Sequence, residues 1–372
     1  MQYENVCIEA IAYTLPDEVV TSAELEARLE PLYRRLRLPE GRLELMTGIR
    51  ERRFWPAGML PSEASIVTGK KALAAAGIDS ANIGALVHGS VCRDHLEPAT
   101  ACRVHHGLDL PADCLVYDVS NACLGLMNGM LQVANMIELG QIRAGLVLGT
   151  ESSRPLVETT IAALNADQSL TRRQIKQAVA SLTIGSGSAA VLLVDRRLSR
   201  TGNHLVTAVA RSSSRFHDLC HSGADECIAD DMQPIMHTDS ERLMHEGVQA
   251  ALPAYEKLLA NAGWTAGELD KTVCHQVGVA HRRMLLETLG LDPARDFSTV
   301  EYLGNTGSVA LPMTAAIGIE QGHLQPGDQL ALLGIGSGIN VLMLAVEWQQ
   351  SPTRRGRHSG SRSKLGAANT HS

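Results

Sequence analysis

The chain has 372 residues, 45% of them hydrophobic and only 3% aromatic, which suits one large domain or two fused ones. Its formal net charge of −7 offers no attraction for nucleic acid or for an anionic membrane surface. No run reaches the roughly 18 apolar residues of a membrane-spanning helix, and no positively charged leader precedes the first apolar stretch. We therefore expect a cytoplasmic protein with no nucleic acid partner and no membrane span.

Short apolar runs alternate with helical stretches along most of the chain. Strands are predicted at residues 5–13, 83–91, 114–119, 144–150, 188–194, 204–211, 271–277, 329–335 and 340–348. One of the intervening helical stretches has Ser62 as a candidate N-cap and Gly77 as a candidate end. The alternation predicts an α/β protein with parallel sheets covered by helices on both faces.

Residues 351–372 differ in composition from the rest of the chain. They carry five Lys or Arg and no Asp or Glu. The segment is polar, rich in Ser and Gly and without periodicity, so we expect a disordered basic tail. Docking of an acidic acyl carrier protein is the alternative interpretation of its charge.

The eight cysteines are scattered singly, and none forms a Cys-x-x-Cys pair. In a chain of this length without an export signal, we expect reduced thiols, most of them buried. Six residues between 217 and 237 have side chains that can bind metals, but their spacings fit no zinc template, so no metal is expected. They are His217, Asp218, Cys220, His221, Cys227 and His237.

Two segments about half a chain apart, residues 117–152 and 301–338, share one plan. Each has an Asn followed by a small residue, then an apolar helix that ends Ile-Glu-x-Gly, then a turn and an apolar strand. The Asn-to-Ile spacing is 16 residues from Asn121 and 14 from Asn305. An internal duplication explains the match, and chance similarity between two strand–helix–strand units is the alternative.

A fused pair of αβ halves, with a cysteine opening the central helix of the first, resembles the thiolase superfamily. The motifs that resemble its ketoacyl synthase III branch run in order over about residues 3–348. They are TGIRERR (47–53), DVSNACLGLMNG (118–129), GSGSAA (185–190), HQVGVAH (275–281), GNTGSVALP (304–312) and GIGSG (334–338). The resemblance implies a five-layered αβαβα core made of two duplicated halves, residues 1–197 and 198–350.

Cys123 is the candidate nucleophile. It follows a predicted buried strand and precedes an apolar helix, whose first turn has free N–H groups that favour a thiolate. A thiolate accepts an acyl group readily from a thioester. The residue pattern alone is also compatible with a buried, inert cysteine. The resemblance implies that Cys123 carries the acyl group.

His275 ends a predicted strand, and Asn305 lies in a turn flanked by glycines, where Asn is common for its turn geometry alone. The resemblance implies that both donate hydrogen bonds to the thioester oxygen of a second substrate as it becomes an enolate. It also implies a second oxyanion hole made by the backbone N–H groups of Cys123 and Ser337. Because the glycine-rich runs precede strands rather than helices, they predict no dinucleotide site, and no cofactor is expected beyond the CoA thioester substrates.

Residues 90–107 are the least generic part of the chain. Glu97 lies in a Leu-Glu-Pro context where most decarboxylating synthases of this branch have an apolar residue. The resemblance is closest to the thiolases of bacterial olefin biosynthesis (OleA), which join two fatty acyl-CoAs head to head. It implies a homodimer in which Glu97 reaches the active site of the partner subunit. A surface glutamate before Pro98 is the alternative interpretation.

The expected function is a Claisen condensation of two acyl-CoAs through an acyl-cysteine to a β-ketoacyl thioester. A decarboxylating 3-oxoacyl-ACP synthase III, which uses malonyl-ACP, is the alternative within the resemblance. The order Cys, His, Asn also suits a papain-like hydrolase, but the Cys-Gly-Ser-Cys-Trp context of that family is absent. A non-catalytic scaffold of the same fold is a further alternative, which retention of all four candidate residues disfavours.

Overall fold

The computed structural model describes residues 1–222 and 236–350, and the predicted basic tail lies outside this part of the chain. One sheet has the strand order β11-β12-β13-β8-β1-β7-β6-β4-β5. The strands are β1 (Val6–Thr14), β4 (Ile83–Gly89), β5 (Leu115–Val119), β6 (Ala144–Glu151), β7 (Gly187–Asp195), β8 (His204–Ser212), β11 (Lys271–Cys274), β12 (Gln329–Gly336) and β13 (Asn340–Glu347). All nine predicted strands are therefore confirmed, with ends that differ by at most a few residues.

The prediction of parallel sheets is wrong for part of the structure, because the sheet is mixed. Strand β4 pairs in parallel with β5 and β6, as β11 does with β12. In contrast, β7 runs antiparallel to β6 and β1, and β13 runs antiparallel to β12 and β8. The connection between β12 and β13 spans only residues 337–339, which is too short for the crossover that a parallel pair requires.

The two halves of the chain follow the same course. The first runs β1, α4 (Pro61–Ala76), β4, α5 (Thr100–Gly107), β5, α6 (Gly125–Glu138), β6 and β7. The second runs β8, α9 (Ser240–Ala262), β11, α10 (Val279–Leu289), α12 (Ala310–Glu320), β12 and β13. An isolated parallel bridge between Thr272 and Asp296 stands where β5 stands in the first half. This repeated order supports the internal duplication rather than chance similarity.

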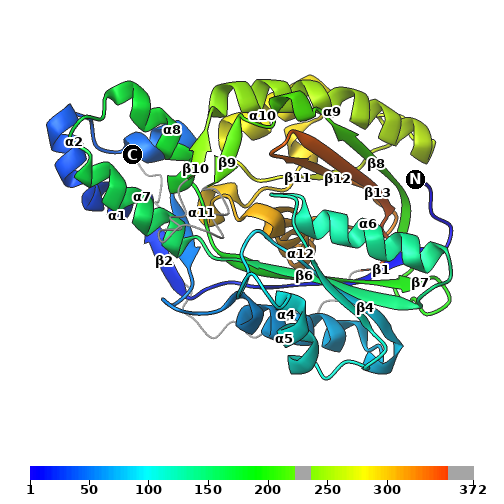
Figure 1. Ribbon diagram of the computed structural model, residues 1–372. Helices are drawn as coiled ribbons and strands as arrows, with labels where there is room; N and C mark the ends of the chain where they lie inside the picture. Colours follow the sequence, from blue (N-terminus) through cyan, green and yellow to red (C-terminus); the bar gives the residue numbers. More distant parts are fainter. Residues whose placement is uncertain (223–235, 351–372) are drawn as a thin grey trace, which may run out of the picture.

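Helices α6 and α12 lie between the two halves of the sheet, α9 and α10 cover one outer face, and α4 and α5 cover the other (Figure 1). The halves join where β1 meets β8, through the bridge between Cys7 and His204. The layers therefore follow the expected αβαβα order. Residues Ala310–Ile319 of α12 are all buried, as expected for a helix enclosed on every side.

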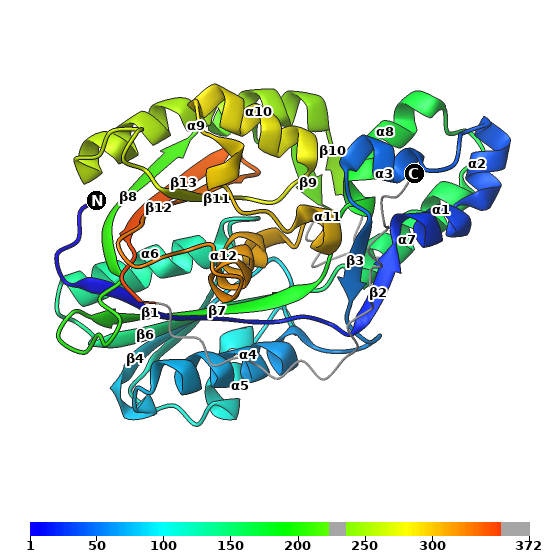
Figure 2. The same ribbon diagram turned by 180° about the vertical axis from the view of Figure 1, so that it is seen from behind.

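A smaller lobe lies beside these layers (Figure 2). Its elements are β2 (Glu18–Thr21), α1 (Ser22–Arg28), α2 (Glu30–Leu36), α3 (Arg42–Thr47), β3 (Glu51–Phe54), α7 (Arg154–Ala166) and α8 (Arg172–Leu182). Leu25, Leu32 and Val157 lie in its separate apolar core. The remaining short elements are β9 (Cys220–Ser222), β10 (Met236–Thr238) and α11 (Val300–Leu303).

One helix cap differs from the prediction. Helix α4 begins at Pro61 with Leu60 as its N-cap, so Ser62 lies inside the first turn and its buried hydroxyl does not cap the helix. Proline suits this first position because its ring fixes φ and the missing N–H would have no partner there. Gly77 ends the helix in the left-handed conformation, as predicted.

Helix α6 is seated against the end of β4 without intervening side chains. A Cβ atom added to Gly89 would lie 2.5 Å from the carbonyl oxygen of Gly125 and 2.7 Å from the Cα of Leu126. These obstacles are backbone atoms, which do not move aside as a flexible side chain does. The start of α6, and with it Cys123, is therefore placed by direct backbone packing on β4.

We expect Gly89→Ala to lower the free energy of unfolding by about 3 kcal/mol, because the added methyl overpacks this contact. Urea unfolding followed by circular dichroism measures the change. Gly267→Ala is the matched control, since a Cβ there meets nothing closer than Thr265 Oγ1 at 3.9 Å. Equal stability of the two variants would contradict the close seating of α6 on β4.

Candidate active site

Cys123 lies in a tight turn between β5 and α6. Ala122 has a φ of 43°, in the left-handed region that side chains rarely adopt, and this strain presents Cys123 at the end of the turn. The side chain of Asn121 secures the turn: its Oδ1 accepts from Asn340 Nδ2 at 3.1 Å and its Nδ2 donates to Asn128 Oδ1 at 2.7 Å. Residues of β13 and α6 thus hold the backbone around Cys123.

The second half of the chain reaches Cys123 through the end of β12. A Cβ added to Gly336 would lie 3.7 Å from the Cβ of Cys123 and 3.0 Å from Leu124 Cγ. Glycine thus lets the last residue of β12 approach the Cys123 turn. Ser337 follows directly, so the structure brings together the two residues whose backbone N–H groups are predicted to form an oxyanion hole.

Burial dominates the electrostatics of Cys123. The residue keeps some solvent exposure, but protein atoms enclose its thiol, and this burial raises the thiol pKa to about 12. Nearby Cys220 and the carboxylate of Glu151 raise the pKa further, and only the backbone N–H of Cys123 lowers it. The expectation of a thiolate favoured by the helix start is therefore wrong for this single chain. A partial charge of about +0.5 at a helix start does not offset removal of the thiol from water.

His275 directly follows β11, and its N–H donates to the carbonyl of Leu333 on β12 at 3.0 Å. Its side chain is buried, and neither ring nitrogen has a hydrogen-bond partner among the described residues. Burial, together with nearby His281, lowers the pKa of His275 to about 3. His275 is therefore a neutral imidazole, and its unused N–H is available to a substrate oxygen.

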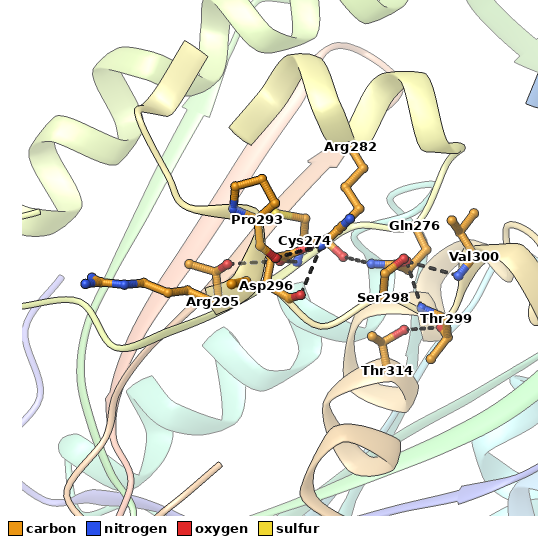
Figure 3. Close-up of polar contacts among 12 residues, drawn as sticks. Cys274, Gln276, Arg282, Pro293, Arg295, Asp296, Ser298, Thr299, Val300 and Thr314 are labelled. Atoms are coloured by element: carbon orange, nitrogen blue, oxygen red, sulfur yellow. Dashed lines mark hydrogen bonds and ion pairs between the residues drawn. The ribbon is translucent and has the colours of Figure 1, made fainter. Parts of the chain in front are cut away.

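Cys274 and Gln276, which flank His275 in the chain, are held in place by polar contacts (Figure 3). On one side, Asp296 Oδ1 accepts from the N–H of Cys274 at 3.1 Å, and Arg282 Nε contacts Asp296 Oδ2 at 2.5 Å. On the other side, Gln276 Nε2 donates to the Cys274 carbonyl at 2.6 Å. Gln276 Oε1 accepts hydrogen bonds from Ser298 Oγ, Thr299 N and Val300 N.

Asn305 is held by a short parallel bridge to the segment before β7. Its N–H donates to the Thr183 carbonyl and its own carbonyl accepts from the N–H of Gly185, each at 2.9 Å. Its side-chain Oδ1 accepts from the N–H of Gly307 at 3.0 Å. Since the acceptor end is engaged in the turn, the NH₂ end of Asn305 is the group left to donate to a ligand.

Glu97 is exposed in the single subunit, in the loop between β4 and α5. Asp94 anchors this loop: its Oδ1 accepts from the N–H of Ser62 at 2.9 Å, and its own N–H donates to Thr100 Oγ1 at 3.1 Å. The thiol of Cys123, by contrast, is enclosed. The single subunit thus leaves Glu97 on its surface.

Two further residues of this region escaped the sequence analysis. His281 is buried in α10, where it contributes to the low pKa of His275, and burial lowers the pKa of His281 itself to about 4. Glu151, at the end of β6, accepts hydrogen bonds from the loop after β4 and from Ser308, and its charge acts on the Cys123 thiol. Position at the end of a buried strand was the only sequence signal for Glu151.

Among residues 1–222 and 236–350, no group of three or more His, Cys, Asp or Glu side chains is placed to hold a metal ion. Cys227, one of the residues considered for a metal site, lies outside the described residues. None of the helices in the described chain is long and apolar enough to cross a membrane.

Comparison with known proteins places this geometry in a family. Residues 57–177 match the model of the thiolase N-terminal domain, and residues 259–348 match that of the 3-oxoacyl-[acyl-carrier-protein] synthase III C-terminal domain. An acyl-CoA:acyl-CoA alkyltransferase of Shewanella oneidensis is 45% identical over 94% of this chain and the whole of the relative. One of Xanthomonas campestris is 34% identical over 94% of this chain, also along its whole length.

Solved structures agree with this placement. A variant of OleA from Xanthomonas campestris superposes with a TM-score of 0.87 at 33% identity, covering 94% of this chain and 98% of that one. A second variant of the same protein, with bound lauric acid and lauroyl-CoA, gives a TM-score of 0.86 at 33% identity over 93% of this chain and all of that one. The fold and the site define an acyltransferase of the thiolase superfamily. Within it, the chain belongs to the acyl-CoA:acyl-CoA alkyltransferase (OleA) family.

The buried, neutral state of His275 predicts a pH dependence of stability. The folded-state pKa of about 3 lies below the usual 6.5, so the unfolded chain binds a proton first as pH falls. The contribution of neutral, buried His275 to the free energy of unfolding is therefore complete above pH 6.5 and is lost as pH falls toward 3. Between pH 7.5 and 5, this loss is about 2 kcal/mol.

We expect His275→Gln to remove that part of the pH dependence, measured by urea unfolding at both pH values. His245→Gln, a change on the exposed surface of α9, is the matched control and should show the same acid loss as the wild type. An unchanged acid loss in His275→Gln would mean that the imidazole is not buried in its neutral form.

Proposed function

We propose that this chain condenses two fatty acyl-CoA molecules through an acyl-cysteine intermediate and releases a β-ketoacyl thioester. The observation that carries the proposal is the meeting of the two halves at one site, where the Cys123 turn packs against the end of β12. Neutral His275, which directly follows the neighbouring strand β11, adds a buried donor without a partner in the described chain. Membership in the alkyltransferase family supports the same reaction and the choice of CoA thioesters over carrier-protein thioesters.

In the first half-reaction, the sulfur of Cys123 attacks the thioester carbonyl of one acyl-CoA. The carbon–sulfur bond to CoA breaks, and the thiol proton leaves with CoA as its free thiol. The backbone N–H groups of Cys123 and Ser337 would stabilise the oxyanion of the tetrahedral intermediate. The high pKa of the Cys123 thiol means that this proton transfer accompanies attack instead of preceding it.

In the second half-reaction, a second acyl-CoA loses a proton from its α-carbon to Glu97 of the partner subunit. His275 and Asn305 donate hydrogen bonds to the resulting enolate oxygen. The α-carbon then attacks the acyl-cysteine carbonyl, the carbon–sulfur bond to Cys123 breaks, and β-ketoacyl-CoA forms. The proton taken up by Glu97 returns to the Cys123 sulfur, which restores both groups. A neutral imidazole suits this role because its N–H donates a hydrogen bond to the enolate oxygen without transferring the proton to the enolate.

A cytoplasmic homodimer completes the proposal, and two features of the single subunit support it. Strand β5 pairs with β4 on one side only, so within the described sheet its other edge is open. Val91, Leu96 and Leu115 around this edge are 48%, 55% and 52% exposed. An open edge with apolar neighbours is normally covered. Because Val91 and Leu96 belong to the loop of Glu97, a two-fold partner on this surface would lie next to Glu97.

The decarboxylating synthase is the less supported alternative. A β-ketoacyl-[acyl-carrier-protein] synthase III of Rhodospirillum rubrum is 27% identical over 87% of this chain, well below the alkyltransferase relatives. A malonyl thioester forms its enolate by losing carbon dioxide, so that reaction needs no base. The negative charge of Glu97 would also repel the malonyl carboxylate. We therefore expect the wild type to use malonyl thioesters poorly.

We expect Cys123→Ala to abolish acyl loading while leaving the fold intact, because no other thiol is held in the strained turn before α6. Intact-protein mass spectrometry after incubation with acyl-CoA should show one added acyl group in the wild type and none in the variant. Cys220→Ala is the matched control, since this neighbouring thiol should be dispensable for loading. An acylated Cys123→Ala protein would place the nucleophile elsewhere.

We expect Glu97→Gln to keep acyl loading on Cys123 and to lose condensation by ~10²–10⁴-fold, the usual contribution of a general base. His95→Gln, an exposed change on the same loop, should condense normally. Product formation from acyl-CoA by liquid chromatography measures both variants.

Mixing two inactive variants tests whether the base crosses between subunits. After subunit exchange, a heterodimer of Cys123→Ala and Glu97→Gln has one site with both wild-type groups, so about a quarter of wild-type condensation should return under random pairing. No recovery, or an active monomer by light scattering, would contradict a base supplied by the partner.

A further inference from the structure

Glu151 is a buried carboxylate that forms no ion pair with Lys, Arg or His in the described part of the chain. Its residue is 5% exposed, at the last position of β6. Oε1 accepts from Val91 N at 3.0 Å, from Ser308 N at 3.3 Å and from Ser308 Oγ at 2.5 Å, and Oε2 accepts from Cys92 N at 3.2 Å. These four hydrogen bonds compensate the buried charge.

The donors come from two segments that are far apart in the sequence. Val91 and Cys92 open the loop that carries Glu97, whereas Ser308 closes the turn that begins at Asn305. The carboxylate of Glu151 therefore connects two segments: the loop that carries Glu97, the proposed base, and the turn that begins at Asn305, a proposed oxyanion donor. Its backbone carbonyl adds a third connection by accepting from Trp55 Nε1 at 3.0 Å.

The turn is shaped to receive this carboxylate. Gly307 has a φ of 56°, and a Cβ added there would lie 3.2 Å from the carboxylate carbon of Glu151. Asn305 Oδ1 is bound to the N–H of this same glycine at 3.0 Å. A shift of Glu151 would thus move Gly307 and Ser308, and through Gly307 it would reorient the side chain of Asn305.

We propose that Glu151 is a positioning residue for condensation: it holds the turn of Asn305 in its own site and the loop whose Glu97 serves the partner's site, so one carboxylate couples the two sites of the dimer. The inference rests on the proposed function, since it assigns Glu151 to the second half-reaction. Glu151 is not itself placed to accept a proton, because four donors already occupy its two oxygens. Its charge has a second effect, since it opposes ionisation of the Cys123 thiol.

Glu151→Gln replaces one acceptor oxygen with an NH₂ group that faces N–H donors, while keeping the size of the side chain. We expect acyl loading of Cys123 within about threefold of the wild type, because the Cys123 turn is held by other residues. Condensation should fall about 10²-fold, the usual effect of a small misplacement of reacting groups. Ser308→Ala removes one of the four hydrogen bonds to Glu151. It should lower the ratio of the condensation rate to the loading rate by about tenfold, as expected for roughly 1.4 kcal/mol.

Iodoacetamide alkylation of Cys123 gives a readout that does not depend on turnover. Loss of the negative charge in Glu151→Gln should lower the thiol pKa, so the pH profile of alkylation should shift to lower pH. Glu9→Gln is the matched control: Glu9, on β1, is also buried and accepts from Ser199 Oγ and the N–H of Arg200, but it lies beside the end of β7 that is distant from Glu151. It should change neither the ratio nor the profile.

The outcomes separate this inference from the proposed function. If the wild type forms no β-ketoacyl product from acyl-CoA, the proposed function fails and this inference fails with it. If the wild type condenses, but Glu151→Gln and Ser308→Ala slow loading and condensation by the same factor, only the positioning role is overturned. The same holds if Glu9→Gln reproduces their effect. If Glu151→Gln does not fold, the ratio of condensation to loading in Ser308→Ala decides whether Glu151 has the positioning role.

Discussion

The enclosure of two helices between two half-sheets is the constraint on which the rest of this structure depends. Helix α12 is surrounded by protein and nearly all of its residues are buried, whereas α6 buries one apolar face and keeps a polar one. The start of α6 approaches the strands closely. Gly89 and Gly336 allow that approach at the start of α6. Cys123, which precedes this helix, is consequently placed at the seam between the two halves of the chain.

The same enclosure decides the charge states at the site. Removal from water raises the pKa of the Cys123 thiol to about 12 and lowers that of His275 to about 3, so both groups are neutral near pH 7. Neutral Cys123 and His275 need no counterion. They also suit a thioester substrate, which is uncharged at the reacting carbon. Glu151, a buried carboxylate near Cys123, forms no ion pair among the described residues and is stabilised by hydrogen bonds.

The sequence was sufficient for the strands, the duplication and the motif positions, because these depend on local periodicity and on repeated residue patterns. All nine strands were predicted from apolar runs, and the matched Asn motifs around Asn121 and Asn305 indicated two similar halves. Motif order identified Cys123, His275 and Asn305 as candidates, and the structure brings Cys123 to the strand end before Ser337, while His275 follows the adjacent strand. Strand direction was less accessible, since an apolar run has the same pattern whichever way its neighbour runs.

What only the tertiary structure decided depends on contacts between distant segments. The hydrogen bonds of Glu151 were invisible in the sequence, because its partners lie in a distant loop and a distant turn. The resting state of Cys123 was predicted wrongly, since the helix start is a local feature whereas burial is set by the whole fold. The exposure of Glu97 also emerged only from the fold, because a loop sequence does not say which surface it covers. Local patterns determined where the reactive residues stand in the chain, and packing determined their charge and their neighbours.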